Sequence, residues 1–409
     1  MQSTSVPSSE RSQTVVRLLE GTRTKEEYEE FRQALLLSGQ RQLEEFLSTH
    51  IRASDGQPRR GVGARRLPDG EVYEGQLVSE IREGKGVLTL GPGEVYFGDF
   101  KHNRPEGRGV QLYPGGEKYE GAFLQGRRHG QGRYVYLTGD FYEGEWKDGL
   151  RSGQGKMYFY GTDELYDGQW VDGFRQGSGT FKFSFGDIYQ GSWKSDMREG
   201  SGKLAYANGD VYEGNWVRDQ AHGTGVMTYA DGDKYEGTWC EGRKTGQGTW
   251  KSKEGTYTGM FKNDQPFGKG VFKYANGDVY SGMWKEGMKE GLGTYTFSTG
   301  EVYEGDWVND EFGGSGEFKS KDGRHIGDWN RGYSEGEGLC EYPTGEIYQG
   351  SFKNGQRWGA GQYAWPSGHL FVGSWEKDLP NGTGTLKDPA SGKIKSVRYD
   401  GRKFTTDVY

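Results

Sequence analysis

The sequence repeats with a period of 23 residues, and this period limits the possible folds more than any other feature. A triplet of an aromatic residue, any residue and glycine recurs fourteen times from Tyr73 to Phe371, with His325 as the lead residue of the twelfth copy. A Gly-x-Gly triplet begins eleven residues after every lead residue, as in Gly84-Lys85-Gly86. The spacing slips once to 24 and twice to 22 residues, always between a Gly-x-Gly triplet and the next lead residue. We therefore expect the length to vary in one exposed turn of each unit.

Within each unit the side chains alternate with a period of two, which is typical of half-buried strands. Tyr142, Gly144 and Trp146 alternate with charged residues. The fourth residue after the lead residue is aromatic in thirteen units, and nine of these residues are tryptophans: Trp146, Trp170, Trp193, Trp216, Trp239, Trp284, Trp307, Trp329 and Trp375. Turn signals such as Asn208-Gly209 separate the strands. The pattern predicts one β-hairpin per unit and a continuous antiparallel sheet.

Glycine is abundant, with 73 of 409 residues, about 18% against a usual ~7%. A glycine in a strand marks a place where another group approaches the backbone closely. We expect each aromatic ring to lie across a glycine of an adjacent strand, so that a single layer buries its own rings. A strand spacing of ~4.8 Å with two strands per repeat gives roughly 130 Å for fourteen repeats.

Two segments carry a resemblance to a known family. Residues 142–149, Tyr-Glu-Gly-Glu-Trp-Lys-Asp-Gly, with the Gly-Gln-Gly that follows, resemble the MORN repeat, as do Tyr212-Glu-Gly-Asn-Trp216 and His222-Gly-Thr-Gly225. The resemblance covers residues 61 to about 390, and His325, Phe371 and an extra Trp358 depart from it. The expected fold is mainly β: an elongated single-layer antiparallel sheet of about fourteen tandem hairpins, preceded by a short α-helical module.

Residues 1–60 have no repeat and predict short helices. Thr24 opens a capping box for a helix that ends near Leu37, while Leu43, Phe46 and Leu47 suggest a second helix and Val15 to Leu19 an earlier one. This module either caps the edge of the first hairpin or docks a partner or a second copy. The expected segments are an α-helical module (1–54), a basic linker with the start of a truncated repeat (55–66), the repeat ribbon with a leading half repeat (61–390) and a tail or partial repeat (391–409).

Composition argues against several classes of protein. The net charge of −7 disfavours general nucleic-acid binding. The two cysteines, Cys240 and Cys340, make neither a disulfide framework nor a zinc site. Residues 1–10 do not resemble a secretory signal, and no apolar run approaches the ~18 residues of a membrane span. We expect a soluble protein of a reducing compartment.

No catalytic constellation stands out from the period. A phosphate-binding loop opens a helix, whereas these Gly-x-Gly triplets occur between strands in all fourteen units. Histidines are scattered, and no Ser/His/Asp or Cys/His set is apparent. We therefore expect no enzyme activity, no cofactor and no metal.

Charged residues occupy fixed columns of the repeat. Asp or Glu stands two residues before the lead residue in eleven units, as in Asp140, Asp187 and Asp278. Basic residues stand eight or nine residues after it, at the opposite end of the hairpin, and the candidate site consists of Arg82, Arg104, Arg127, Arg128, Arg151, Arg175, Arg198, Arg243 and Lys244. These columns predict one acidic and one basic edge. They serve either solubility and turn formation or the binding of an acidic partner, such as an acidic protein surface or anionic lipid headgroups.

The resemblance implies a structural scaffold of a cytoskeletal assembly in the cytoplasm, of the ciliary or flagellar axoneme and radial-spoke type. The alternative is a membrane-tethering module that binds phosphoinositides through the basic turns of repeats 1–8. A third possibility is an adaptor for a motor or a signalling enzyme. The expected partners are proteins, with anionic lipids and a second copy at a terminal sheet edge as further candidates.

Overall fold

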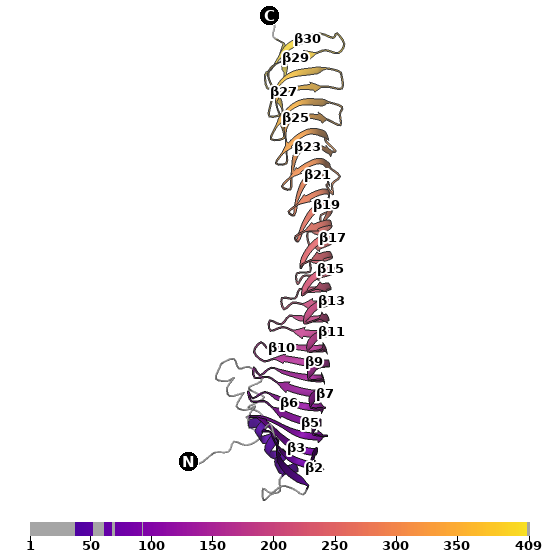
Figure 1. The fold of residues 1–409 in the computed structure, drawn as a ribbon. Coiled ribbons are helices and arrows are strands. Elements are labelled where there is room, and N and C mark those ends of the chain that lie inside the picture. The colour runs from indigo at the N-terminus through magenta and orange to yellow at the C-terminus, as the bar shows by residue number, and fades with distance from the viewer. Residues whose placement is uncertain (1–36, 52–60, 68–69, 92, 407–409) are drawn as a thin grey trace, which may run out of the picture. The chain divides into compact units, whose positions relative to one another are not determined.

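The computed structural model describes residues 37–51, 61–67, 70–91 and 93–406 (Figure 1). These residues form one helix and 31 strands, so the prediction of a mainly β fold built from tandem hairpins is confirmed. The chain divides into two compact units, unit 1 (Met1–Asp219) and unit 2 (Gln220–Tyr409). Each unit is an open antiparallel sheet in which every strand pairs with the strands that precede and follow it in the same unit.

Unit 1 contains fourteen strands, which follow one another in chain order in Figure 1. They are β1 (Val62–Arg66), β2 (Val72–Val78), β3 (Ile81–Gly91), β4 (Glu94–Lys101), β5 (Arg104–Leu112), β6 (Lys118–Leu124), β7 (Arg127–Val135), β8 (Phe141–Lys147), β9 (Leu150–Phe159), β10 (Glu164–Val171), β11 (Phe174–Lys182), β12 (Ile188–Lys194), β13 (Met197–Ala205) and β14 (Val211–Val217).

Unit 2 continues the pattern with seventeen strands. They are β15 (Gln220–Thr228), β16 (Lys234–Cys240), β17 (Arg243–Ser252), β18 (Gly255–Lys262), β19 (Gln265–Tyr274), β20 (Val279–Lys285), β21 (Met288–Thr296), β22 (Val302–Val308), β23 (Glu311–Ser320), β24 (Gly323–Asn330), β25 (Tyr333–Glu341), β26 (Ile347–Lys353), β27 (Gln356–Ala364), β28 (Leu370–Glu376), β29 (Leu379–Lys387), β30 (Ile394–Tyr399) and β31 (Phe404–Thr406).

The hairpin of β8 and β9 shows the geometry of the hairpins that lie within one compact unit. Its two-residue turn, Asp148-Gly149, has φ values of 50° and 89°. Two left-handed residues define a type I′ turn, whose twist matches that of the flanking strands. The turn places Trp146 opposite Arg151, and Gly144 lies opposite Gly155. Two extra residues of β9 bulge between these pairs.

The first glycine of the Gly-x-Gly triplet lies in this bulge. Gly153 has a φ of 61°, a left-handed conformation that favours glycine. The first glycines of the other thirteen Gly-x-Gly triplets have φ values of 56° to 85°. The two glycines of each triplet are therefore needed for different reasons, because only the second one lies beneath a ring, as described below.

The turns between successive hairpins absorb the slips in the period, as predicted. The 24-residue spacing falls across the connection between Phe159 and Glu164, where β9 is one residue longer than β7 and β11. One of the 22-residue spacings corresponds to the two-residue connection between Ser252 and Gly255.

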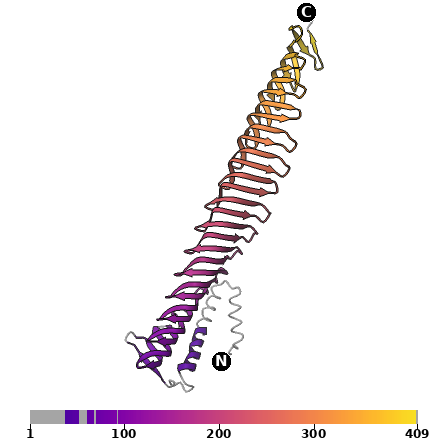
Figure 2. The same ribbon diagram turned by 90° about the vertical axis from the view of Figure 1, so that its right-hand side faces the viewer.

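The described N-terminal helix lies on the sheet of unit 1. Residues 37–46 are α-helical and continue into the π-helix η1 (Leu47–Ile51). Phe46 packs on Phe97 of β4 with ring centroids 5.5 Å apart, and Ile51 is fully buried beside Val87 and Phe97. Figure 2 shows this helix beside the first strands of the unit. The helix predicted around Leu43, Phe46 and Leu47 is confirmed.

The helix of residues 37–51 covers a face of the sheet and not the edge of the first hairpin, whose capping is one of the two alternatives for the N-terminal module. We call the side that carries Tyr142, Gly144 and Trp146 the ring face, and the other side the opposite face. The helix lies on the opposite face, because it packs on Phe97, whose side chain points to that side. Most other repeats carry a polar residue in the column of Phe97. The helices predicted at Val15 to Leu19 and from Thr24 to Leu37 lie outside the described residues, except for Leu37 itself.

Candidate interaction surface

The lead tyrosines pack within the hairpins that carry them, so their rings are not available to a partner. Twelve of them are almost completely buried. A Cβ atom added to Gly144 would lie 2.4 Å from the Cα atom of Gly155, and one added to Gly155 would lie 2.2 Å from the Tyr142 hydroxyl. The ring of Tyr142 therefore covers both glycines of its own hairpin, which confirms the predicted packing of rings on glycine. Burial raises the pKa of the equivalent Tyr73 to about 12.

The tryptophans connect one hairpin to the one before it. The indole Nε1 of Trp146 donates to the carbonyl oxygen of Gly132 in the preceding hairpin, at 3.0 Å. Its ring meets Tyr142 and Tyr119 edge to face, at centroid distances of 5.1 and 5.3 Å. All nine predicted tryptophans donate in the same way, at 3.0–3.4 Å. These contacts couple neighbouring repeats, as stability along a repeat array requires.

The predicted basic edge separates into two classes of residue. Six of the nine candidates, one position beyond the other three, fold back onto the ring face: Arg82, Arg128, Arg151, Arg175, Arg198 and Lys244. The remaining three are exposed on the opposite face: Arg104, Arg127 and Arg243. The predicted basic column therefore divides between two faces: three of the nine candidates are exposed, and the other six are stacked on rings. A two-residue turn pairs the ninth residue after the lead residue with the tryptophan position, and so turns it to the ring face.

Arg198 shows how the first class is held. Its guanidinium carbon lies 4.3 Å from the ring centroid of Trp216, within the range of a cation–π interaction. Its Nε donates to the Asp219 carboxylate at 3.0 Å, and Nη2 donates to the Asp219 carbonyl oxygen at 2.7 Å. Its side chain is only 18% exposed. A binding partner would have to break these contacts to reach the charge.

Lys244 is the most enclosed member of this class. Its Nζ lies 3.9 Å from the ring centroid of Trp250, and the residue is 8% exposed. Burial lowers the pKa of the Lys244 ammonium to about 8, against the opposing effect of Asp264 and Asp233. Phe312 occupies the equivalent position in β23 and stacks on Tyr303 at 3.8 Å, which confirms that this column serves packing.

The predicted acidic edge also serves the fold. Asp140 accepts a hydrogen bond from the backbone N–H of Tyr160 in the next turn, at 2.8 Å. Asp187 accepts from Ala207 at 2.9 Å in the same way. Asp278 accepts from Ser298 at 2.8 Å and from the Tyr295 hydroxyl at 2.6 Å, so the pKa of its carboxyl group falls to about 2.

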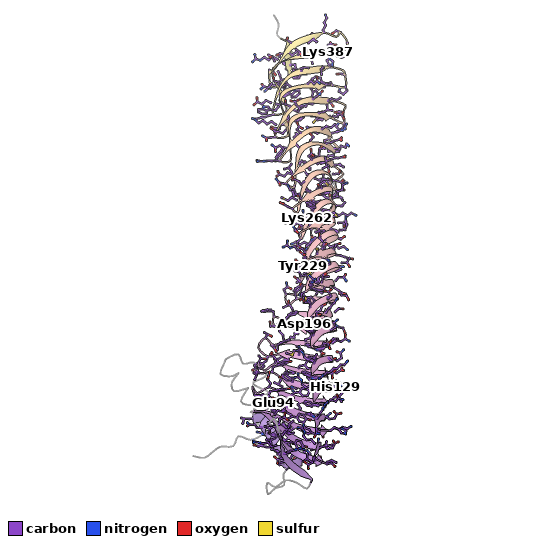
Figure 3. All side chains as sticks on the ribbon, in the orientation of Figure 1. Glu94, His129, Asp196, Tyr229, Lys262 and Lys387 are labelled. Atoms are coloured by element: carbon purple, nitrogen blue, oxygen red, sulfur yellow. The ribbon has the colours of Figure 1, made fainter. Side chains whose placement is uncertain are left out.

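A second set of ties between repeats was missed from the sequence. The side chain of Gln176 accepts a hydrogen bond from the backbone N–H of Ser195 in the next turn, at 3.1 Å. Five glutamates in the same column do likewise: Glu83, Glu106, Glu199, Glu290 and Glu335. Asp196 of that turn, labelled in Figure 3, accepts from the backbone N–H of Arg175 at 2.9 Å. The column of Glu and Gln ten residues after the lead residue could have revealed this role.

A strip along the type I′ turns on the opposite face of unit 1 is exposed. It consists of six directly paired positions and the last residue of β14. We define this turn-edge strip by its thirteen residues, all exposed: Val78, Ile81, Lys101, Arg104, Leu124, Arg127, Lys147, Leu150, Val171, Phe174, Lys194, Met197 and Val217. Eight of them are apolar, five are basic and none is acidic. The equivalent positions of unit 2 include Glu311 and Glu376.

The twelfth repeat differs from the others in its core. His325 takes the place of the lead tyrosine, and its Nδ1 lies 2.9 Å from Sγ of Cys340. Burial lowers the pKa of the imidazole to about 4 and raises that of the thiol to about 11. Nε2 of His325 has no hydrogen-bond partner. A Cβ atom added to Gly327 would lie 3.4 Å from Nε2, so the ring fits its glycines less tightly than a tyrosine.

The described residues contain neither a metal-binding cluster nor a membrane-spanning helix. In the part of the chain that the structure covers, no group of three or more His, Cys, Asp or Glu residues is placed to hold a metal ion. The helix of residues 37–51 is the only one described, and it is too short to cross a bilayer. The expectations of no enzyme activity and no cofactor stay predictions.

Solved structures resemble the chain only weakly. The TCP domain of SAS-4 (dCPAP) from Drosophila melanogaster, in complex with a proline-rich motif of Ana2, is 14% identical; the match covers 43% of this chain and 90% of that one, with a TM-score of 0.26. The TCP10 domain of CPAP from Danio rerio, with a STIL peptide, is 15% identical over 63% and 96%, with a TM-score of 0.22. A streptogramin B lyase is 13% identical over 60% and 80%, with a TM-score of 0.12. Scores this low carry no argument about function.

A family model matches the chain along most of its length. No curated protein matches the chain. The family model described as the MORN repeat matches fourteen segments: 73–95, 96–118, 119–141, 142–162, 166–187, 189–211, 212–234, 235–256, 257–279, 280–302, 303–323, 325–347, 348–370 and 371–392. Each matched segment begins at a lead residue. The chain belongs to the MORN-repeat family.

Proposed function

We propose that the protein is a non-enzymatic scaffold of a cytoskeletal assembly in the cytoplasm, of the ciliary or flagellar axoneme and radial-spoke type. MORN repeats act as structural or interaction scaffolds. The observation that carries the proposal is the use of the aromatic, acidic and most of the basic columns in contacts within and between repeats. These columns make a self-supporting platform, and the turn-edge strip stays free to meet a partner.

The composition of the strip supports a partner with an anionic, partly apolar surface. Exposed apolar side chains are interleaved with cations, and Phe174 and Val78 are 54% and 60% exposed. Charge complementarity favours an acidic protein surface. A terminal strand such as β1, which pairs only with β2 among the described strands, offers a further site for a second copy.

A membrane-tethering function is the second candidate, and the same strip favours it. Interleaved apolar and basic residues suit the interface of an anionic bilayer, where each cation near the surface contributes about 1 kcal/mol. Phosphoinositide headgroups would meet Arg104 and Arg127, which are the exposed members of the predicted site in unit 1.

The test compares two double charge reversals in the full chain. Arg104→Glu/Arg127→Glu changes the strip, and Lys262→Glu/Lys285→Glu makes the same charge change at exposed positions of unit 2. Retention of the wild type and the control in a detergent-extracted cytoskeleton, with loss of the strip variant, supports the scaffold. A wild type that is extracted by detergent overturns it. Salt-sensitive co-sedimentation with phosphoinositide vesicles, lost in the strip variant, supports the membrane function.

A further inference from the structure

The turn-edge strip has a geometry that narrows the class of partner. Its paired positions recur once per hairpin on one face and at one edge, as in Lys147 opposite Leu150 and Val171 opposite Phe174. Two strands separate one pair from the next, which is about 9.6 Å along the sheet. One heptad of an α-helix rises about 10.5 Å. A helix that runs along the strip therefore meets each successive pair with nearly the same residue of its heptad.

The chain already seats one helix in this way. Residues 37–51 lie on the opposite face of unit 1, from Gln42 beside Lys118 of β6 to Ile51 beside Val87 of β3. Phe46 rests on Phe97, and a Cβ atom on Gly39 would lie 2.8 Å from the Leu112 side chain. The helix thus crosses successive strands along the stacking direction. The opposite face thus accepts a helix where Val87, Phe97 and Val110 make it apolar.

The cations of the strip favour acidic residues on the two flanks of such a helix. The strip presents Lys101, Arg104, Arg127, Lys147 and Lys194 without an acidic residue at any of its thirteen positions. Several turn-tip carboxylates beside it are already paired: Glu80 with Arg65, Asp196 with Arg175 and Asp219 with Arg198. The flanking cations are therefore available to an incoming carboxylate, whereas the stacked arginines are not.

We propose that the turn-edge strip of unit 1 docks an amphipathic α-helix with acidic flanks, supplied by a partner protein. Its apolar stripe packs on the exposed apolar residues, chiefly Leu150, Val171 and Phe174, and its carboxylates meet the five cations. The inference rests on the scaffold function proposed above and names the kind of partner that the scaffold holds.

The experiment uses the full chain and a synthetic helical peptide of four heptads, with leucine at a and d and glutamate at the flanking positions. Leu150→Glu/Phe174→Glu alters the strip, and Leu292→Glu/Leu379→Glu alters two exposed leucines of unit 2, which are 68% and 53% exposed. We expect salt-sensitive binding to the wild type and the control, and at least tenfold weaker binding to the strip variant. A peptide with lysine in place of glutamate should not bind.

The outcomes separate this inference from the proposed function. Equal binding of the acidic peptide to all three proteins, or none, overturns the helix-docking inference. Flotation of the wild type with phosphatidylserine vesicles, lost in the strip variant, in the absence of peptide binding assigns the strip to a membrane and also overturns it. Retention of both the wild type and the strip variant in the extracted cytoskeleton leaves the scaffold standing without the strip. If the wild type is not retained in the extracted cytoskeleton, the proposed scaffold function is wrong, whether or not the peptide binds.

Discussion

The hydroxyl of Tyr142 donates a hydrogen bond to the backbone carbonyl oxygen of Glu145 at 2.8 Å. Glu145 directly precedes Trp146, at the point where the register of β8 and β9 shifts. Twelve lead tyrosines make the equivalent bond with the residue three positions later, at 2.8–3.0 Å. The tyrosine thus covers the glycine pair with its ring and satisfies the irregular backbone with its hydroxyl.

Replacing Tyr142 by Phe tests the hydroxyl separately from the ring. The ring packing is kept, but the Glu145 carbonyl oxygen loses its donor, so we expect a loss of about 1 kcal/mol in the free energy of unfolding. The natural Phe371 supplies the reverse experiment: Phe371→Tyr should stabilise the fourteenth repeat by a similar amount. Urea denaturation of both variants measures the two changes. No difference in either variant would mean that the hydroxyl contributes nothing.

The tyrosines also predict sensitivity to alkali. Burial raises the pKa of Tyr73, Tyr189 and Tyr235 to about 12, above the ordinary value of 10.0. Between pH 10 and 12 the unfolded chain has lost protons that the folded chain keeps, so deprotonation favours unfolding. The stabilisation is complete below pH 10 and falls by about 1.4 kcal/mol per pH unit for each such tyrosine in the unfolding unit. Lys244, with its pKa lowered to about 8, and Lys289, whose pKa burial also lowers, oppose this trend below pH 10.5, but the buried tyrosines outnumber them.

Denaturation midpoints at pH 9, 10 and 11, with tyrosinate absorbance near 295 nm, check this prediction. The buried lead tyrosines should lose their protons only when the protein unfolds. Titration of all tyrosines near pH 10 in the folded protein would contradict it.

The two classes of basic residue should respond differently to charge reversal. Arg198→Glu removes the cation from the Trp216 ring and places a carboxylate beside Asp219, so we expect a loss of about 2 kcal/mol in stability. Arg127→Glu, at an exposed position of the turn-edge strip, should leave stability unchanged and alter only partner binding. Guanidinium denaturation compares the two variants. Equal destabilisation would show that the stacked and the exposed classes do not differ.

The twelfth repeat should be the point of acid sensitivity in unit 2. The His325 imidazole has its pKa lowered to about 4 in the fold, against 6.5 in the unfolded chain. Between these values the unfolded chain binds more protons, so the stability of this repeat falls as the pH drops below 6.5. Cys340, the neighbour of His325, does not titrate in this range, since burial raises the pKa of its thiol to about 11 from an ordinary value of 9.0 that already lies above it.

The variant His325→Tyr restores the ring and hydroxyl of the other repeats. The protection factors of β24 and β25 against hydrogen exchange should rise, and their decrease from pH 7 to pH 5 should disappear. Unchanged exchange in the variant at pH 5 would show that the histidine does not set the local stability.

Much of the fold follows directly from the sequence. The alternation of Tyr142, Gly144 and Trp146 fixes one face of a strand, and the eleven-residue spacing to the Gly-x-Gly triplet fixes the hairpin. The glycines report close contact, because no side chain fits between a ring and the strand beneath it. The family resemblance and the structure agree on these points.

The charged columns could not be assigned in the same way. Arg127 and Arg128 are adjacent and identical in type, yet one is exposed and the other lies 4.4 Å from the Trp146 ring centroid. Their difference depends on the turn length, which sets the residue that lies opposite the tryptophan. Likewise, Phe97 interrupts a polar column and marks where the N-terminal helix lands, but a single residue of this kind does not identify what covers it.

A comparison of two glycines of one hairpin tests the central claim, that rings seated on glycine pairs hold the sheet together, most directly. In Gly144→Ala the added Cβ atom would lie 2.4 Å from the Gly155 Cα atom, so we expect a loss of about 2–3 kcal/mol in the free energy of unfolding. Gly149→Asn is the matched control, because the space around Gly149 is open and Asn103 occupies the same turn position with a φ of 70°. A large loss in Gly144→Ala beside an unchanged Gly149→Asn is the predicted result, and equal stability of the two variants would contradict the account.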